Sequence, residues 1–118
     1  MITMAIVAIL ASVAYPSYQQ YILRSNRAEA QSFMMAVALR QQQFLVDTRA
    51  YAATVATTGV PVPPKVEASY TLALPSPGTA PPSFTLTLTP KGRQTADRCG
   101  ALALTHTGGR TAASPGCW

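Results

Sequence analysis

The sequence predicts an α+β protein in which a long N-terminal α-helix packs on an antiparallel sheet of three or four strands. Two observations lead to this class. Apolar residues fill most of positions 1–15 and recur at helical spacing over 17–46, and three later segments alternate apolar and polar residues, as half-buried strands do. A chain of 118 residues has room for one domain of this kind.

The helix begins with a segment, residues 1–15, that is apolar on every side. After Met1, its large aliphatic and sulfur-containing side chains before the proline are Ile2, Met4, Ile6, Val7, Ile9, Leu10 and Val13. A helix of this kind has to be buried in lipid or protein all round. Burying seven such side chains is worth on the order of 10–20 kcal/mol. We therefore expect residues 1–23 to protrude from the folded domain, either as a membrane anchor or inside a bundle of identical helices.

The length and the flanks of this segment argue against an ordinary signal peptide. Fifteen helical residues rise about 22 Å, against roughly 30 Å for the hydrocarbon core of a bilayer. A signal peptide would carry basic residues before the apolar run, whereas the first basic residue here is Arg24. We therefore expect the printed chain to start inside a longer apolar segment.

Pro16 interrupts the helical pattern. Its nitrogen carries no hydrogen to bond the carbonyl of Ser12, and its ring disfavours helical geometry at Tyr15. We expect a kink or a short unwound stretch around residues 12–16.

From Ser17 to about Val46 the helix becomes amphipathic. Polar side chains stand between apolar residues spaced by threes and fours. The apolar residues expected to provide the helix's share of the core are Phe33, Met34, Val37 and Phe44. With this half of the helix, residues 24–118 are predicted to form a globular head.

The rest of the head is predicted as a loop followed by a sheet. Residues 47–68 contain a glycine and three prolines and are expected to form a surface loop. The sheet is predicted within residues 69–113, with strands at 70–74, 84–90, 101–107 and 110–113. The proline-rich link at 75–82 is expected to be a turn.

Two cysteines, Cys99 and Cys117, lie near the C-terminus with seventeen residues between them. In a chain otherwise free of cysteine, this pattern favours a disulfide and an oxidising compartment. Two unpaired buried thiols are the alternative, and a metal site is weaker because His106 is the single histidine.

The chain is basic, with nine Lys and Arg against four Asp and Glu and a formal charge of +5. Lys91, Arg93 and Arg98 come nearest to a cluster. Such charge can attract DNA or anionic lipid without specificity, but a solubilising surface is the favoured explanation.

No catalytic residue, metal or cofactor is predicted. The carboxylates Glu29, Asp47, Glu67 and Asp97 are far apart in sequence, and no Gly-rich phosphate loop precedes a helix. The sequence therefore indicates a protein that is not an enzyme.

The stretches "AIVAILASVAYPSYQQY" and "RSNRAEAQ" resemble the N-terminal helix of type IV pilins, and "DRCGALALTHTGGRTAASPGCW" resembles the disulfide region of pilins that end in Cys-Trp. The resemblance implies a subunit of a bacterial surface filament used in adhesion, twitching motility or DNA uptake. Its implied partners are identical or homologous pilin subunits, the inner membrane before assembly, and a prepilin peptidase with the pilus assembly machinery.

Carried over to this chain, Ile2 to Val13 would pack along the filament axis, Ser12 and Pro16 would mark a site of helix unwinding, and Cys99 and Cys117 would form the family disulfide. The family's Phe-Thr-Leu-Ile-Glu-like start is absent. Met1 would then lie about six residues inside the mature N-terminus, and restoring these gives a segment long enough to anchor in a membrane.

Two other functions remain open at this stage. A pseudopilin of a type II secretion system shares the apolar helix, but its major type usually has a calcium site in place of the C-terminal disulfide. A minor pilin for competence would bind DNA, and weak unspecific DNA binding follows from the basic charge in any case.

Overall fold

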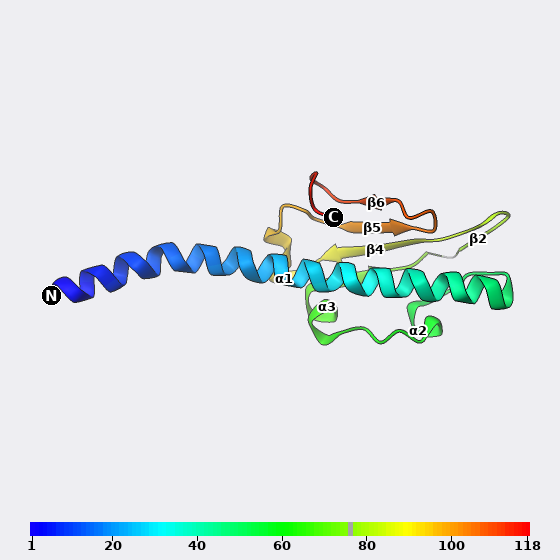
Figure 1. Cartoon of the computed structure of the whole chain (residues 1–118), viewed down its shortest axis with the longest axis horizontal. Helices are drawn as coiled ribbons and strands as arrows, with labels where there is room; N and C mark the ends of the chain where they lie inside the picture. Colours follow the sequence, from blue (N-terminus) through cyan, green and yellow to red (C-terminus); the bar gives the residue numbers. More distant parts are fainter. Residues whose placement is uncertain (76) are drawn as a thin grey trace.

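The computed structural model describes residues 1–75 and 77–118. Its longest element is helix α1 (Ile2–Thr48), with 47 residues. At about 1.5 Å per residue this helix is about 70 Å long, and the molecule measures 70 × 26 × 19 Å. Figure 1 shows that α1 runs the length of the molecule and that the rest of the chain gathers along its second half.

Helix α1 is continuous through Pro16, so of the two alternatives expected at residues 12–16, a kink or a short unwound stretch, this structure does not have the unwound stretch. A proline inside a helix removes one backbone hydrogen bond and crowds one carbonyl, which a long helix can accommodate by bending. In Figure 1 the free half of α1 is bowed without a break. The helix ends two residues later than expected, where Arg49 adopts a left-handed conformation and its N–H bonds the Leu45 carbonyl at 2.8 Å.

Four antiparallel strands form the main sheet, as predicted. They are β1 (Tyr70–Ala73), β4 (Thr85–Pro90), β5 (Leu102–Thr105) and β6 (Arg110–Thr111), in the order β1-β4-β5-β6. Leucines meet across neighbouring strands, with Leu72 opposite Leu88 and Leu86 opposite Leu104. The sheet lies along one side of α1 (Figure 1).

The core lies between α1 and this sheet. Phe33, Met34 and Val37 of α1 are buried there against Tyr70 and the strand leucines. Phe44 is half-buried and lies outside this cluster, which departs from expectation. One turn beyond Val37, the buried Gln41 exchanges hydrogen bonds with the backbone of Ala52, so the returning chain covers the end of α1 through polar contacts.

The segment 47–68, predicted as a loop, contains two short helices, α2 (Val55–Thr58) and α3 (Pro64–Ser69). Thr54 caps α2 by accepting a hydrogen bond from the Thr57 N–H, and Gly59 ends it at a φ of 78°. A proline is favourable at the first position of a helix, which explains the start of α3 at Pro64. A segment rich in proline predicts a loop by its composition, and the capping signals at Thr54, Gly59 and Pro64 are single residues within it.

The predicted turn at 75–82 contains a small hairpin of β2 (Gly78–Thr79) and β3 (Pro82–Ser83). Position 76 of this link lies outside the described residues. After β4, a 3-10 helix, η1 (Gly92–Ala96), brings the chain back to α1.

Cys99 and Cys117 form the predicted disulfide, with their Cα atoms 5.9 Å apart. It closes the chain from the end of η1 to the C-terminus around β5 and β6. A loop of this length is stabilised by about 3 kcal/mol in the chain-entropy description.

Candidate assembly and binding surfaces

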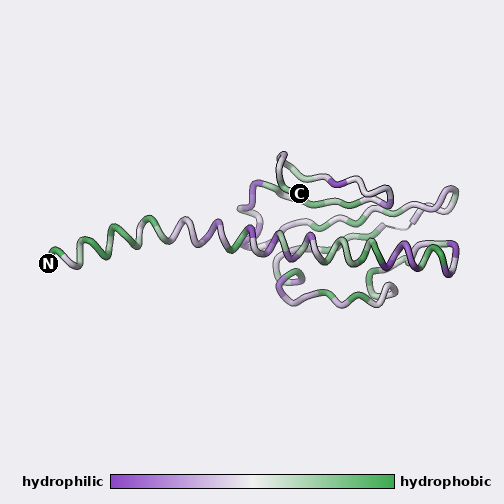
Figure 2. Tube along the Cα trace, in the orientation of Figure 1, coloured by the Kyte–Doolittle hydropathy of each residue, from purple (hydrophilic) through white to green (hydrophobic). Residues whose placement is uncertain are grey.

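The N-terminal half of α1 exposes its apolar side chains, and we call residues 1–23 the rod. Seven of its large apolar side chains are between 51% and 78% exposed: Ile2, Met4, Ile6, Val7, Ile9, Leu10 and Val13. In Figure 2 the first turns of the rod, next to the N-terminus, are predominantly green, the colour of hydrophobic residues, and the trace becomes paler and purple towards the head. The helix is long and apolar enough to cross a membrane, and none of its most apolar window, with a mean hydropathy of 1.4, is buried.

The boundary between rod and head is aromatic and then polar. Tyr15, Tyr18 and Tyr21 are 61–67% exposed, and Leu23 is the first buried residue of α1. The division of the chain into residues 1–23 and 24–118 stays a prediction, although the burial of α1 changes at the same point.

A buried polar network joins the head to α1 just after this boundary. The Gln94 side chain of η1 is buried and donates to the Leu23 carbonyl at 3.0 Å and to the Tyr70 hydroxyl at 3.1 Å. Its amide oxygen accepts a hydrogen bond from Asn26 at 3.1 Å. These contacts fix η1 against α1 at the base of the head.

Asp97 extends the network by one ion pair. Its carboxylate lies 2.6 Å from the Arg27 guanidinium and also accepts a hydrogen bond from the Cys99 N–H. Burial raises the pKa of the nearby Tyr70 phenol, an effect that the hydrogen bond from Gln94 opposes. Sequence reasoning missed Arg27, Gln94 and Asp97, because polar contacts between segments distant in sequence leave no periodic signal.

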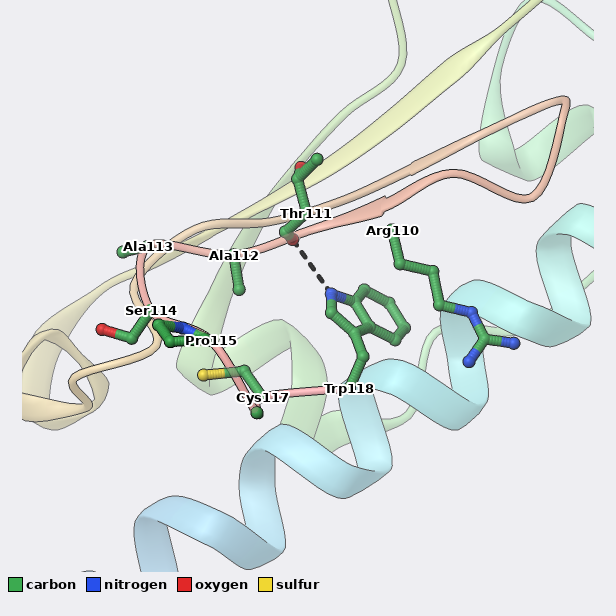
Figure 3. Close-up of a pocket in the computed structure, with 9 residues that line it drawn as sticks. Arg110, Thr111, Ala112, Ala113, Ser114, Pro115, Cys117 and Trp118 are labelled. Atoms are coloured by element: carbon green, nitrogen blue, oxygen red, sulfur yellow. Dashed lines mark hydrogen bonds between the residues drawn. The ribbon is translucent and has the colours of Figure 1, made fainter.

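The C-terminal segment after β5 forms an open hollow of about 450 Å³ lined by residues 110–118. The indole N–H of Trp118 donates to the Thr111 carbonyl at 2.9 Å. The Arg110 guanidinium lies 5.7 Å from the centre of the Trp118 ring (Figure 3). Gln31 of α1 donates to the Cys117 carbonyl and so holds the disulfide region against the helix.

An arginine beside a half-buried indole can bind nucleic acid. A guanidinium pairs with phosphate oxygens, and an aromatic ring offers a surface on which a base can stack. Neither Arg110 nor Trp118 was singled out from the sequence, since they are eight residues apart and meet only because the disulfide turns the chain back.

His106 lies beside the aromatic rings of Tyr51 and Phe84, at 6.3 Å between ring centres. Within residues 1–75 and 77–118, no three His, Cys, Asp or Glu side chains gather in a way that could hold a metal ion. The expectation that the protein has no metal and no catalytic centre stays a prediction.

A protruding apolar helix, an antiparallel sheet packed on its second half and a C-terminal disulfide together define a pilin-like subunit. Residues 16–103 match the family model described as "Type IV minor pilin ComP, DNA uptake sequence receptor", and the chain belongs to this family of type IV minor pilins. The first turns of the rod and the C-terminal hollow lie outside the matched range. No curated protein matches the chain.

Proposed function

We propose that this protein is a structural subunit of a type IV pilus that self-assembles through its rod into a helical filament on the bacterial surface. The observation that carries the proposal is the exposure of seven large apolar side chains on a helix that the head does not cover. The cost of leaving them in water is on the order of 10 kcal/mol, and copies of the same helix can remove it by packing side by side.

Before assembly, the rod would hold the subunit in the inner membrane with the head outside. Prepilin peptidase and the pilus assembly machinery are the partners that this route requires. The membership of a minor pilin family favours this function over the pseudopilin alternative.

The test is Ile9→Arg, compared with Ile9→Leu as a control of similar volume. A buried arginine in the filament axis leaves an unpaired charge, so we expect surface filaments to be lost while the head keeps its fold. Filaments are counted by electron microscopy of sheared material, in a strain that assembles pili from this subunit. Normal filament yield with Ile9→Arg would contradict the proposal.

A second function, favoured by two observations, is that of a DNA receptor within the pilus. The family description names a DNA uptake sequence receptor, and Arg110 and Trp118 line an open hollow on the head. We propose that this hollow contacts DNA through a phosphate on Arg110 and a base or sugar on Trp118.

Gel-shift assays at two salt concentrations, with duplex DNAs of one length and varied sequence, test this second function. Trp118→Ala is expected to weaken binding by about 10-fold, in line with a lost stacking contact, whereas Arg49→Ala at the far end of α1 should not. Binding that disappears at moderate salt and does not depend on the DNA sequence would contradict a receptor function and would be explained by unspecific charge attraction. An unchanged affinity of Trp118→Ala would place the DNA site elsewhere.

A further inference from the structure

The basic side chains of the head are concentrated at the end from which the rod emerges. Five exposed cations lie there, and we call them the collar: Arg24, Lys65, Lys91, Arg93 and Arg98. Arg24 directly follows the buried Leu23, and Lys65 of α3 approaches Ser25 at 3.5 Å. Lys91 and Arg93 flank the start of η1, which Gln94 fastens to the Leu23 carbonyl. Arg98 follows Asp97, which pairs with Arg27 of α1, and its guanidinium donates to the Pro115 carbonyl at 3.5 Å. Segments distant in sequence thus bring these charges close to the first turns of α1 after Leu23.

The acidic groups of this end neutralise only part of the charge. Asp97 is buried in its ion pair with Arg27, and Glu29 lies 3.7 Å from Lys65. Glu67 of α3 is exposed. With Arg27 counted, six basic and three acidic side chains give this end a net formal charge of +3. In Figure 2 the trace is purple where the head begins next to α1.

The surface changes character in a fixed order along α1 towards this collar. It is apolar up to Val13, carries the exposed tyrosines Tyr15, Tyr18 and Tyr21, and becomes basic from Arg24. A bilayer changes in the same order, from hydrocarbon through the interface, where tyrosine is enriched, to the charged headgroups. From Tyr21 to Arg24 the helix rises only about 4.5 Å.

The geometry points to the collar as a binding surface for anionic phospholipid headgroups, which holds the base of the head on the membrane while the rod is inserted. This inference rests on the proposed membrane anchoring of the rod and adds a preference for lipid charge. Lipid is favoured over DNA as the occupant because the collar surrounds the helix that continues into the apolar rod. Each basic residue near an anionic bilayer contributes about 1 kcal/mol of attraction, which is about a 5-fold change in partitioning.

The experiment measures partitioning of the full chain, diluted from detergent, into vesicles of phosphatidylcholine alone and into vesicles with added phosphatidylglycerol. For the unmodified chain we expect the anionic vesicles to be preferred by about 10-fold or more at low salt, with the preference falling at high salt. Arg93→Glu should lower this preference by about 10-fold, and Lys91→Glu should act in the same direction. Arg49→Glu is the matched control, since it makes the same charge change at an exposed arginine beyond the other end of the head.

The outcomes distinguish a failure of the collar proposal from a failure of the proposed membrane anchoring. A chain that binds neither kind of vesicle would refute membrane anchoring, and with it this inference. Equal binding to both kinds would leave the anchor standing and overturn the collar. An effect of Arg49→Glu as large as that of Arg93→Glu would show that only net charge matters. Loss of DNA binding by Arg93→Glu with unchanged vesicle preference would make the collar a DNA surface instead. Circular dichroism checks that each variant is folded.

Discussion

Gln94 shows how one side chain can fix the position of an irregular segment. Its side chain is buried. It donates hydrogen bonds to a backbone carbonyl of α1 and to the Tyr70 hydroxyl, and it accepts one from Asn26. A buried polar group that loses its partner costs about 1–3 kcal/mol. The network therefore stabilises the base of the head only while every member is satisfied.

Gln94→Ala is expected to lower the free energy of unfolding of the head by about 2–4 kcal/mol, because it leaves several buried groups without a partner. Denaturant unfolding, followed in detergent so that the rod stays covered, measures the effect. Gln43→Ala, at an exposed position of α1, is the matched control and should change stability by less than about 0.5 kcal/mol. Equal effects of the two variants would refute a special role of the network.

At the scale of elements, the long helix and the strands could be predicted from the sequence, whereas the short helices could not. The long helix and the four strands follow from apolar periodicity, because one face of each is buried in the core. Helices α2 and α3 are one or two turns long, so their capping residues carry the signal and periodicity does not. The sequence could not decide between a kink and an unwound stretch at Pro16, because local rules for proline ignore the many helical turns on either side.

The candidate surfaces also include one that could be predicted from the sequence and others that could not. The exposed rod could be predicted, since its composition leaves no polar face. The pairing of Arg110 with Trp118 could not, because it depends on the path that the disulfide imposes on the last residues. Three collar residues, Lys91, Arg93 and Arg98, already lie close together in the sequence. Only the tertiary fold brings Arg24 of α1 and Lys65 of α3 to the same end of the head.

The disulfide is the element on which the C-terminal hollow depends. Cys117→Ser is expected to lower the free energy of unfolding by about 3 kcal/mol and to reduce surface filaments without affecting membrane insertion. Trp118 is the single tryptophan of the chain, so its fluorescence reports on the hollow. If Trp118 loses its contacts with Arg110 and Thr111, its emission should become closer to that of a tryptophan exposed to water.

The reduced unmodified chain is the control for this variant and should show the same change in emission and stability. Filament yield and tryptophan emission that both stay as in the oxidised chain would contradict a structural role of the disulfide.

At the scale of the whole molecule, the structure has two parts that favour different solvents, water for the head and an apolar environment for the rod. The head buries its core and exposes charge, whereas the rod exposes seven large apolar side chains on the half of α1 that precedes its first buried residue, Leu23. Such a molecule is stable only where the rod is covered, by lipid before assembly or by other rods within a filament.

Light scattering combined with size-exclusion chromatography, applied to the intact chain after it is diluted from detergent into plain buffer, tests this account most directly. Because water cannot cover the rod, we predict that the chain leaves solution as polymers or binds added vesicles, with no lasting monomer at micromolar concentration. A stable, monodisperse monomer without detergent or lipid would contradict it.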